Sequence, residues 1–358
     1  MKKITSVILA VLLTASLAAC SKETETKTVT DVSDIQTTVA TKTENTEETT
    51  VAIDEETMEE TTVETKPEIT IVDVPAEDFE TQYDASLGGV IITKYNGSEK
   101  GIRVPAEIDG DPVLKIGHKA FYYSPVKKLE LSEGITTIGE YGLTCLTLEE
   151  VIMPTSLTKL DNSAFRECKA LTEIVIPETV TEFGDNMFNS CYALETVVIQ
   201  ANITELPEDT FRKCKALTTV SLPDNLISIG EWTFGDCASL ATIMLPDTVE
   251  VFGSNTFNGC ANLTEFTIPK NTTTVSEYMF ENCENLKTVI LHDNIKRIED
   301  YAFKNCSNLR ELTLPDNIEQ VNKWAFGGCT ALTVTYKGQT YLASDAERLS
   351  ADIEANNA

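Results

Sequence analysis

Nine cysteines recur in this chain at one fixed interval. They lie 23 residues apart without exception: Cys145, Cys168, Cys191, Cys214, Cys237, Cys260, Cys283, Cys306 and Cys329. A fixed period in this range is typical of a solenoid, in which each repeat is one turn stacked on the turn before it. A solenoid offers an extended surface for contacts and rarely contains a catalytic pocket.

A large apolar residue precedes each cysteine and sets the frame of the repeat. The series is Phe121, Leu143, Phe165, Phe188, Phe211, Phe234, Phe257, Phe280, Phe303 and Phe326. In a full unit the Cys follows the Phe by three positions and a Leu follows it by six. Aliphatic residues come at nine and eleven, often with a Pro at twelve. Alternation at nine and eleven is the period of a strand, so Ile174 and Ile176, or Val220 and Leu222, are expected to face the core.

Strands of successive turns should lie side by side, about 4.8 Å apart. The predicted fold class is therefore a repeat solenoid. We expect a β-rich, right-handed coil of about ten turns of 22–23 residues. One face should carry a parallel sheet, and both ends should be capped, because an unpaired strand edge promotes aggregation.

The cysteine column has a structural interpretation. Identical residues on successive turns point in one direction, so we expect nine buried, reduced thiols that pack as small hydrophobic groups. Disulfides between neighbouring turns are an alternative in a secreted protein. A metal site is a weaker alternative, because the sequence has no short Cys-x-x-Cys spacing. We predict no metal and no cofactor.

The N-terminus indicates where the protein goes. Lys2 and Lys3 precede an apolar run, residues 4–15, which is too short to be a stable membrane span. The sequence Leu-Ala-Ala-Cys at residues 17–20 resembles the lipobox of bacterial lipoproteins. That resemblance implies a signal peptide over residues 1–19, lipidation of Cys20 and an extracytoplasmic protein, lipid-anchored to the bacterial cell membrane and exposed at the surface. An ordinary secretory signal is the alternative.

Residues 20–72 are predicted to be the lipidated Cys followed by a disordered tether. Residues 21–70 contain 16 Thr, 14 Asp or Glu, 4 Lys and no aromatic residue. Such a composition cannot bury enough apolar surface to offset its conformational entropy. Glycosylation of the threonines is compatible with the sequence but is not indicated by it.

The solenoid, residues 119–336, is expected to lie between two caps. Regular structure should begin near Phe79, and residues 73–118 read as an N-terminal β cap. Residues 337–358 read as a C-terminal cap with a short helix. In that helix Ser344 and Glu347 resemble a capping box. Ala346, Leu349 and Ile353 share the helix face expected to cover the last turn.

The repeat pattern Cys-x-x-Leu-x-x-[Ile/Val]-x-[Leu/Ile]-Pro, completed by the Phe, resembles the BspA-like class of bacterial leucine-rich-repeat surface proteins. The resemblance covers residues 79–340. It implies a non-enzymatic protein at the cell surface, in some members an adhesin. It implies no particular ligand.

The outward side of the predicted sheet is the candidate site. One column combines acidic and hydroxyl side chains: Glu150, Glu173, Thr196, Thr219, Thr242, Glu265, Thr288 and Glu311. The column beside it is partly apolar and includes Val175, Val198, Met244 and Ile290. Apolar residues that face water on neighbouring strands can mark a binding face. The alternative is that Val, Ile and Thr simply suit strands.

The sequence predicts a binding protein rather than an enzyme. A net charge of -29 argues against nucleic acid, and we find no nucleophile elbow and no Gly-rich phosphate loop. The first hypothesis is a surface protein that binds a host or bacterial protein through the solenoid face, in adhesion or recognition. The alternatives are a glycan-binding protein and a structural cell-envelope protein. The predicted sheet face has no aromatic residue, so Trp232 and Trp324, near the turns, are the only sugar-stacking candidates at this stage.

Overall fold

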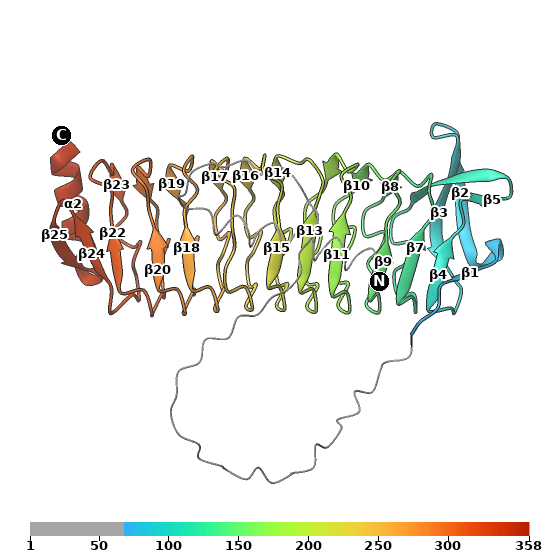
Figure 1. Cartoon of the computed structure of the whole chain (residues 1–358), viewed down its shortest axis with the longest axis horizontal. Coiled ribbons are helices and arrows are strands. Elements are labelled where there is room, and N and C mark those ends of the chain that lie inside the picture. Colours follow the sequence, from blue (N-terminus) through green and yellow to red (C-terminus); the bar gives the residue numbers. More distant parts are fainter. Residues whose placement is uncertain (1–67, 358) are drawn as a thin grey trace, which may run out of the picture. The chain divides into compact units, whose positions relative to one another are not determined.

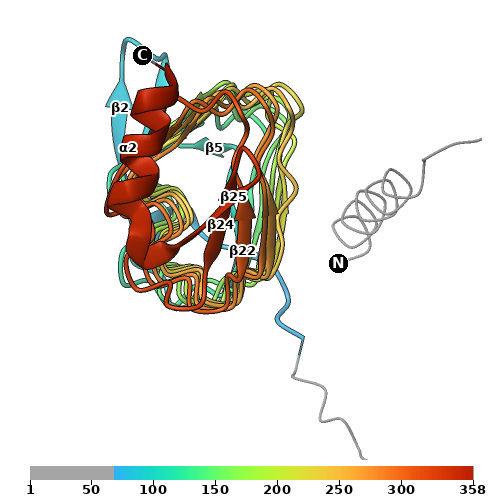
Figure 2. The ribbon, with the colours of Figure 1, turned by 90° about the vertical axis from the view of Figure 1, so that its left-hand side faces the viewer.

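Short parallel strands run in two rows along the body of the protein, residues 68–357, which the computed structural model describes (Figure 1). This body is a β-solenoid of about 11 turns, as the repeat predicts. Seen from one end, the turns superpose into a closed outline (Figure 2). The predicted signal peptide, Cys20 and residues 21–67 of the predicted tether lie outside the described residues.

The first row holds the strands that the sequence predicts. It consists of β1 (Val72–Asp73), β4 (Gly101–Val104), β7 (Lys128–Leu131), β9 (Glu150–Ile152), β11 (Glu173–Ile176), β13 (Thr196–Ile199), β15 (Thr219–Ser221), β18 (Glu265–Thr267), β20 (Thr288–Ile290), β22 (Glu311–Thr313) and β24 (Thr333–Tyr336). Paired residues within each sheet are one repeat apart, as in Glu173, Thr196 and Thr219. Ile174 and Ile176 are buried as predicted, whereas Val220 and Leu222 are only half-buried.

The predicted parallel pairing on one face is confirmed, but it is interrupted along the solenoid. The first row is divided into four separate sheets. Residues 241–246 form no strand, so Thr242 and Met244 lie outside the ladder. The physical reason is that, in the described structure, the backbone N–H groups of residues 242–245 donate no hydrogen bond to the preceding turn. The turn stays in the stack through its buried Leu240 and Val249.

The second row was not predicted from the sequence. It consists of β6 (Asp111–Ile116), β8 (Thr137–Ile138), β10 (Lys159–Leu160), β12 (Glu182–Phe183), β14 (Glu205–Leu206), β16 (Ser228–Ile229), β17 (Val251–Phe252), β19 (Thr274–Val275), β21 (Arg297–Ile298) and β23 (Gln320–Val321). Most of these strands have only two residues, and two residues are too short to show the alternation that identifies a strand. Their second residue carries the apolar side chain, as Ile229 and Val321 show.

The N-terminal end combines a hairpin with the first turns. η1 (Ala76–Asp78) leads into β2 (Phe79–Asp84), which pairs antiparallel with β3 (Gly89–Tyr95), and β5 (Glu107–Ile108) pairs antiparallel with β6. β4 and β6 already belong to the two rows, so part of the predicted cap is solenoid. β1 pairs with β4 through Val72 and Ile102, and regular structure therefore begins before Phe79.

The C-terminal end is closed by β25 (Gln339–Leu342), η2 (Ala343–Asp345) and α2 (Ala346–Asn357). β25 pairs antiparallel with β24, and α2 lies across the end of the coil (Figure 2). The helix buries Ala346, Leu349 and Ile353, as predicted. The predicted capping box is wrong: the Ser344 hydroxyl is 3.4 Å from Asp345 Oδ1, and the helix starts directly from a 3-10 turn.

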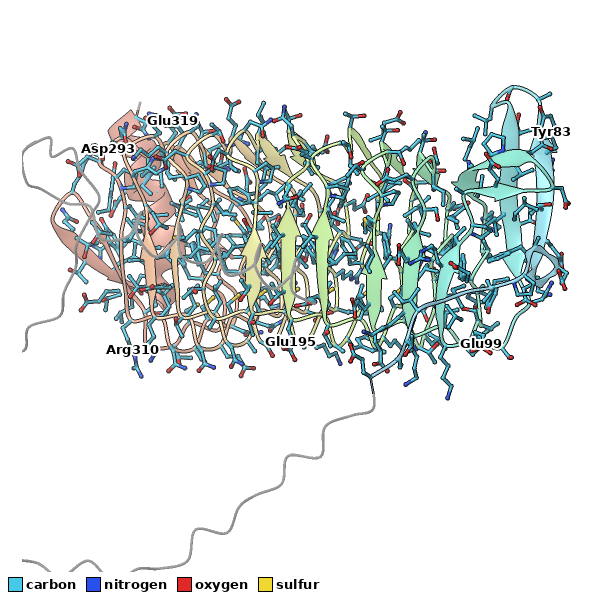
Figure 3. All side chains as sticks on the ribbon, turned by 45° about the vertical axis from the view of Figure 1, so that its right-hand side comes forward. Tyr83, Glu99, Glu195, Asp293, Arg310 and Glu319 are labelled. Carbon is cyan, nitrogen blue, oxygen red and sulfur yellow. The ribbon has the colours of Figure 1, made fainter. Side chains whose placement is uncertain are left out.

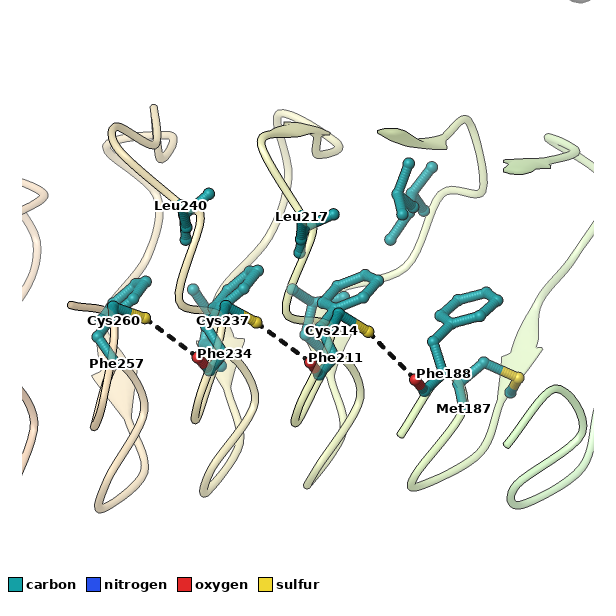
Figure 4. Close-up of a cluster of buried hydrophobic side chains, with 14 of the residues drawn as sticks. Met187, Phe188, Phe211, Cys214, Leu217, Phe234, Cys237, Leu240, Phe257 and Cys260 are labelled. Carbon is teal, nitrogen blue, oxygen red and sulfur yellow. Dashed lines mark hydrogen bonds between the residues drawn. The ribbon is translucent and has the colours of Figure 1, made fainter. Parts of the chain in front are cut away.

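Stacked phenylalanines and a ladder of thiols form the core (Figure 4). The rings of Phe211 and Phe234 are 5.3 Å apart and those of Phe234 and Phe257 are 5.2 Å apart. The Cys237 thiol donates a hydrogen bond to the Phe211 carbonyl of the preceding turn, at 3.2 Å. The same carbonyl accepts the N–H of Cys214 at 2.9 Å. Each thiol thus joins two turns.

All nine cysteines of the column are buried, and none forms a disulfide in the described structure. Burial raises the pKa of the Cys237 and Cys283 thiols well above the ordinary value. The neutral thiol is therefore the stable form, and it is the form that can donate to a carbonyl. Thiolate chemistry is therefore disfavoured at these two cysteines.

The corners of the turns need left-handed backbone. In most turns the residues two positions before and two positions after the Phe have positive φ, such as Trp232 (54°) and Asp236 (60°). At the second of these corners two turns have glycine, Gly259 (75°) and Gly328 (80°). Only glycine adopts this conformation without steric cost.

Candidate binding surface

The outward positions of the first row, here called the sheet face, are aligned as the sequence predicts. Glu173, Thr196 and Thr219 lie in register across three strands, and Glu265 pairs with Thr288. The sheets that carry Glu150 and Glu311 are separate from these. The predicted column is therefore present, but it is distributed over several short sheets.

Exposure along the acidic and hydroxyl column is uneven. Its N-terminal members are half-buried (Glu150, Glu173, Thr196 and Thr219) and its C-terminal members are exposed (Thr242, Glu265, Thr288 and Glu311). The Glu150 carboxylate also lies 2.9 Å from the Lys128 ammonium, which neutralises it. Glu265 and Glu311 form no ion pair with another described residue. The C-terminal half is consequently the more accessible and the less neutralised part of the sheet face.

The apolar column is also uneven. Met244 is 66% exposed and Ile290 is 54% exposed, while Val175 is half-buried. Val198 is wrong as a binding residue, because only 3% of it is exposed. It sits in the middle strand of its sheet, between Val175 and Ser221 in register, and it offers almost no surface to a partner.

A shallow hollow of about 420 Å³ lies over β20 and β22. It brings together three of the predicted residues, Thr288, Ile290 and Glu311. It also contains Lys287 and Arg310, which the sequence reasoning missed. Each of the two cations precedes the first residue of its strand, at the edge where the strands of the first row begin and where Figure 3 labels Arg310. Basic residues at one repeat position in neighbouring turns could have revealed this pair.

The two tryptophans lie at the corners. Trp232 is half-buried, with the Arg212 guanidinium 4.2 Å from its ring centre. Trp324 is 50% exposed and lies parallel to Tyr301 at 6.5 Å, and Tyr301 stacks on Tyr278 at 4.9 Å. Tyr301 is therefore stacked on both faces, whereas Trp324 ends the stack. Within residues 68–357 we find no cluster of His, Cys, Asp and Glu suited to a metal ion, and no helix there has the length and apolarity needed to cross a membrane.

Stacked turns of 23 residues with a strand-bearing face are typical of leucine-rich-repeat proteins. More specifically, the chain belongs to the BspA-type leucine-rich-repeat family, whose sequence model matches in six copies over residues 106–218 and 204–333. Proteins of this family are typically surface proteins.

Several solved structures are similar to this chain. One is a leucine-rich cell surface protein of Faecalibacterium prausnitzii A2-165, 22% identical, with 73% of this chain and 94% of that chain covered and a TM-score of 0.49. Another is the leucine-rich-repeat protein of T. pallidum, 24% identical, with 66% and 91% covered and a TM-score of 0.38. A third, from Bacteroides capillosus ATCC 29799, is 30% identical, with 35% and 96% covered and a TM-score of 0.32. No curated protein matches the chain.

Proposed function

We propose that the chain is a bacterial surface lipoprotein that binds a protein partner through the C-terminal half of the sheet face and catalyses no reaction. The observation that carries the proposal is the hollow over β20 and β22, in which Ile290 is exposed beside unpaired charges. The family supports a place at the cell surface. The anchor rests on the sequence around Cys20.

The composition of the hollow suits a protein–protein contact. Such contacts combine an apolar centre with a polar rim, and a few central side chains provide most of the binding energy. Ile290 supplies the apolar centre, and Thr288 and Thr313 supply hydroxyl groups. Lys287, Arg310 and Glu311 place both signs of charge around it. The fitting partner is a protein segment with one apolar side chain flanked by charged ones.

The N-terminal half of the sheet face fits this role less well. Ion pairs already occupy its charges, as in Lys128 with Glu150 and Arg103 with Glu130, both at 2.9 Å. A partner would have to break these pairs before it could use either charge. The C-terminal half needs no such rearrangement.

The proposal is tested with a matched pair of variants. Ile290→Asp places a charge in the hollow, and Val251→Asp places the same charge in the second row, where Val251 is 56% exposed. The full chain with Cys20→Ser, which blocks acylation, is titrated against a fixed panel of purified extracellular-matrix and bacterial surface proteins. We expect Ile290→Asp to weaken saturable binding by at least about tenfold, with Val251→Asp unchanged. Equal binding by the two variants, or no saturable binding to any protein of the panel, would overturn the proposal.

The anchor has its own test. Cells that express the natural chain should incorporate labelled palmitate into it and hold it in the membrane fraction. Cys20→Ser should remove both properties, because a chain with no acyl group has no lipid anchor. Release of the natural chain into the medium without label would refute the lipoprotein assignment.

A further inference from the structure

A tyrosine lies between two lysines on the edge of the body that leads into the first row of strands. The ammonium groups of Lys169 and Lys215 are 5.7 Å and 5.6 Å from the centre of the Tyr192 ring. The three residues follow Cys168, Cys191 and Cys214 directly, so they occupy one repeat position in three successive turns. A backbone hydrogen bond also joins two of these turns, because the N–H of Ala216 donates to the Tyr192 carbonyl at 3.2 Å.

The positive charge of this edge is neutralised only in part, because Lys169 lies 3.6 Å from the Glu167 carboxylate and Arg212 lies 3.2 Å from the Asp209 carboxylate. Most lysines and arginines among residues 68–357 form an ion pair with a carboxylate, but Arg166, Lys213 and Lys215 form none with a described residue. They lie in the two short segments 166–169 and 212–215. Beyond Lys215 the sequence has no lysine or arginine before Lys270. The edge is therefore a basic island in a chain of net charge -29.

Exposed apolar side chains continue the same edge toward the N-terminus. Tyr122 is 42% exposed, Tyr123 is 73% exposed and Leu146 is 38% exposed, in the turns just before Lys169. Tyr192 is itself 41% exposed. The two neighbouring tyrosines stack at 4.1 Å, and the Tyr122 hydroxyl donates to the Tyr123 hydroxyl at 3.2 Å. We call this set, from Tyr122 to Lys215, the turn edge.

We propose that the turn edge binds a linear acidic polysaccharide along the solenoid axis. Tyr123, which is 73% exposed, offers a ring face to the polarised C–H groups of a sugar, and the Tyr192 ring holds the two ammonium groups at the surface. The Lys215 ammonium has no carboxylate partner among the described residues, and the Lys169 ammonium can exchange its exposed partner Glu167 for a carboxylate of the ligand. Lys169 and Lys215 are two turns apart, about 10 Å at the spacing of stacked strands. A polymer with one carboxylate on every second sugar matches that spacing, and this site is separate from the sheet face.

The charge of the chain favours such a sparse polyanion over nucleic acid. Duplex DNA carries one negative charge per about 1.7 Å of its axis, and that density would be repelled by the many carboxylates of this body. A polysaccharide with one carboxylate per disaccharide has far fewer charges within a Debye length of about 8–10 Å. The basic island can therefore bind it locally.

The test measures binding of the full chain with Cys20→Ser to hyaluronan, with dextran, poly-glutamate and single-stranded DNA as comparison probes. Saturable binding to hyaluronan is expected, with weaker binding at higher salt. Tyr192→Ala should weaken it by about tenfold. The double variant Lys169→Gln and Lys215→Gln should weaken it at least as much and reduce its dependence on salt. Tyr83→Ala, at a tyrosine that is 54% exposed elsewhere, and Lys270→Gln are the matched controls and should bind normally.

Each outcome decides between surfaces and ligand classes. Ile290→Asp should leave hyaluronan binding unchanged, so failure of the sheet face and failure of the turn edge are separable. Binding to poly-glutamate or DNA that equals binding to hyaluronan would show attraction by charge alone and would overturn the proposal. Binding to dextran, or an unchanged Tyr192→Ala variant, would also overturn it. Protein ligands that are lost in the Tyr192→Ala variant, with no binding to hyaluronan, would assign the turn edge to a protein partner instead.

Discussion

Inward-facing residues repeat from turn to turn, whereas outward-facing residues of the same turns vary. Inside, each turn repeats one set of side chains, such as Phe234, Cys237 and Leu240, because each of them must pack on its copy in the next turn. Outside, one repeat position reads Lys169, Tyr192 and Lys215 in three successive turns. Stacking explains the first pattern completely and leaves the second free to vary. Information about partners therefore lies where neighbouring turns differ.

The largest expected effect comes from removing one ring of the inner phenylalanine column. Phe234→Ala should lower the free energy of unfolding by about 3–5 kcal/mol, because it opens a cavity between two stacked rings. Phe234 is fully buried, with rings at 5.3 Å and 5.2 Å on either side. Urea unfolding followed by circular dichroism measures the change. Thr218→Ala, at an exposed position, is the control, and a loss below about 1 kcal/mol for Phe234→Ala would contradict the ladder.

The next largest loss of unfolding free energy is expected from removing one thiol of the cysteine column. Cys237→Ala removes a buried sulfur together with its hydrogen bond to the Phe211 carbonyl, and we expect a loss of about 2 kcal/mol. The carbonyl keeps its bond from the Cys214 N–H, which limits the loss. The same urea experiment measures it. An unchanged midpoint would mean that the thiol contributes neither packing nor a useful hydrogen bond.

Two adjacent glycines at one corner test whether positive φ requires glycine there. Gly328 has φ of 80°, and an added Cβ would clash with Asn305 Oδ1, so Gly328→Ala should cost about 1–2 kcal/mol. At Gly327 the nearest atom to an added Cβ is the Trp324 carbonyl oxygen at 3.5 Å, an ordinary contact. Gly327→Ala should stay within about 0.5 kcal/mol of the natural chain. Equal effects of the two substitutions in thermal unfolding would refute the corner argument.

The inner columns were predictable because their cause is local in the repeat. The spacing of Phe165, Cys168 and Leu171 predicts that all three are buried, and they are. The second row of strands was not predicted, because most of its strands have two residues, too few to show an alternating pattern. The absence of a strand at residues 241–246 was not predicted either, because the sequence there keeps the apolar alternation although the backbone hydrogen bonds are not made.

The surfaces were predictable only in part, for a different reason. Which residues point outward follows from alternation, so Thr288, Ile290 and Glu311 were found. How far each is exposed depends on its neighbours in adjacent turns, and that is why Val198 is buried. The contact of Tyr192 with Lys169 and Lys215 joins residues 23 positions apart. It becomes visible in the sequence only when the turns are aligned.

The smallest and sharpest test uses two neighbours in the turn that lacks a strand. Ile243 is half-buried and packs against the core, whereas Met244 is 66% exposed. Ile243→Thr should lower the free energy of unfolding by about 1–2 kcal/mol, because it replaces the partly buried ethyl group of Ile243 by a hydroxyl. Met244→Thr should change it by less than about 0.5 kcal/mol. Parallel urea titrations of the two variants measure the difference.

The outcome of this pair decides whether side-chain packing or the backbone ladder sets which residues of a turn face inward. If Ile243→Thr alone is destabilising, side-chain stacking orients the turn even where the ladder hydrogen bonds are absent. Met244 would then be a surface position that can change freely to suit a partner. If both substitutions cost the same, the alternation depends on the backbone ladder, and residues 241–246 have no defined inner side. That second result would remove Met244 from the sheet face and leave the exposed part of that face to β18, β20 and β22.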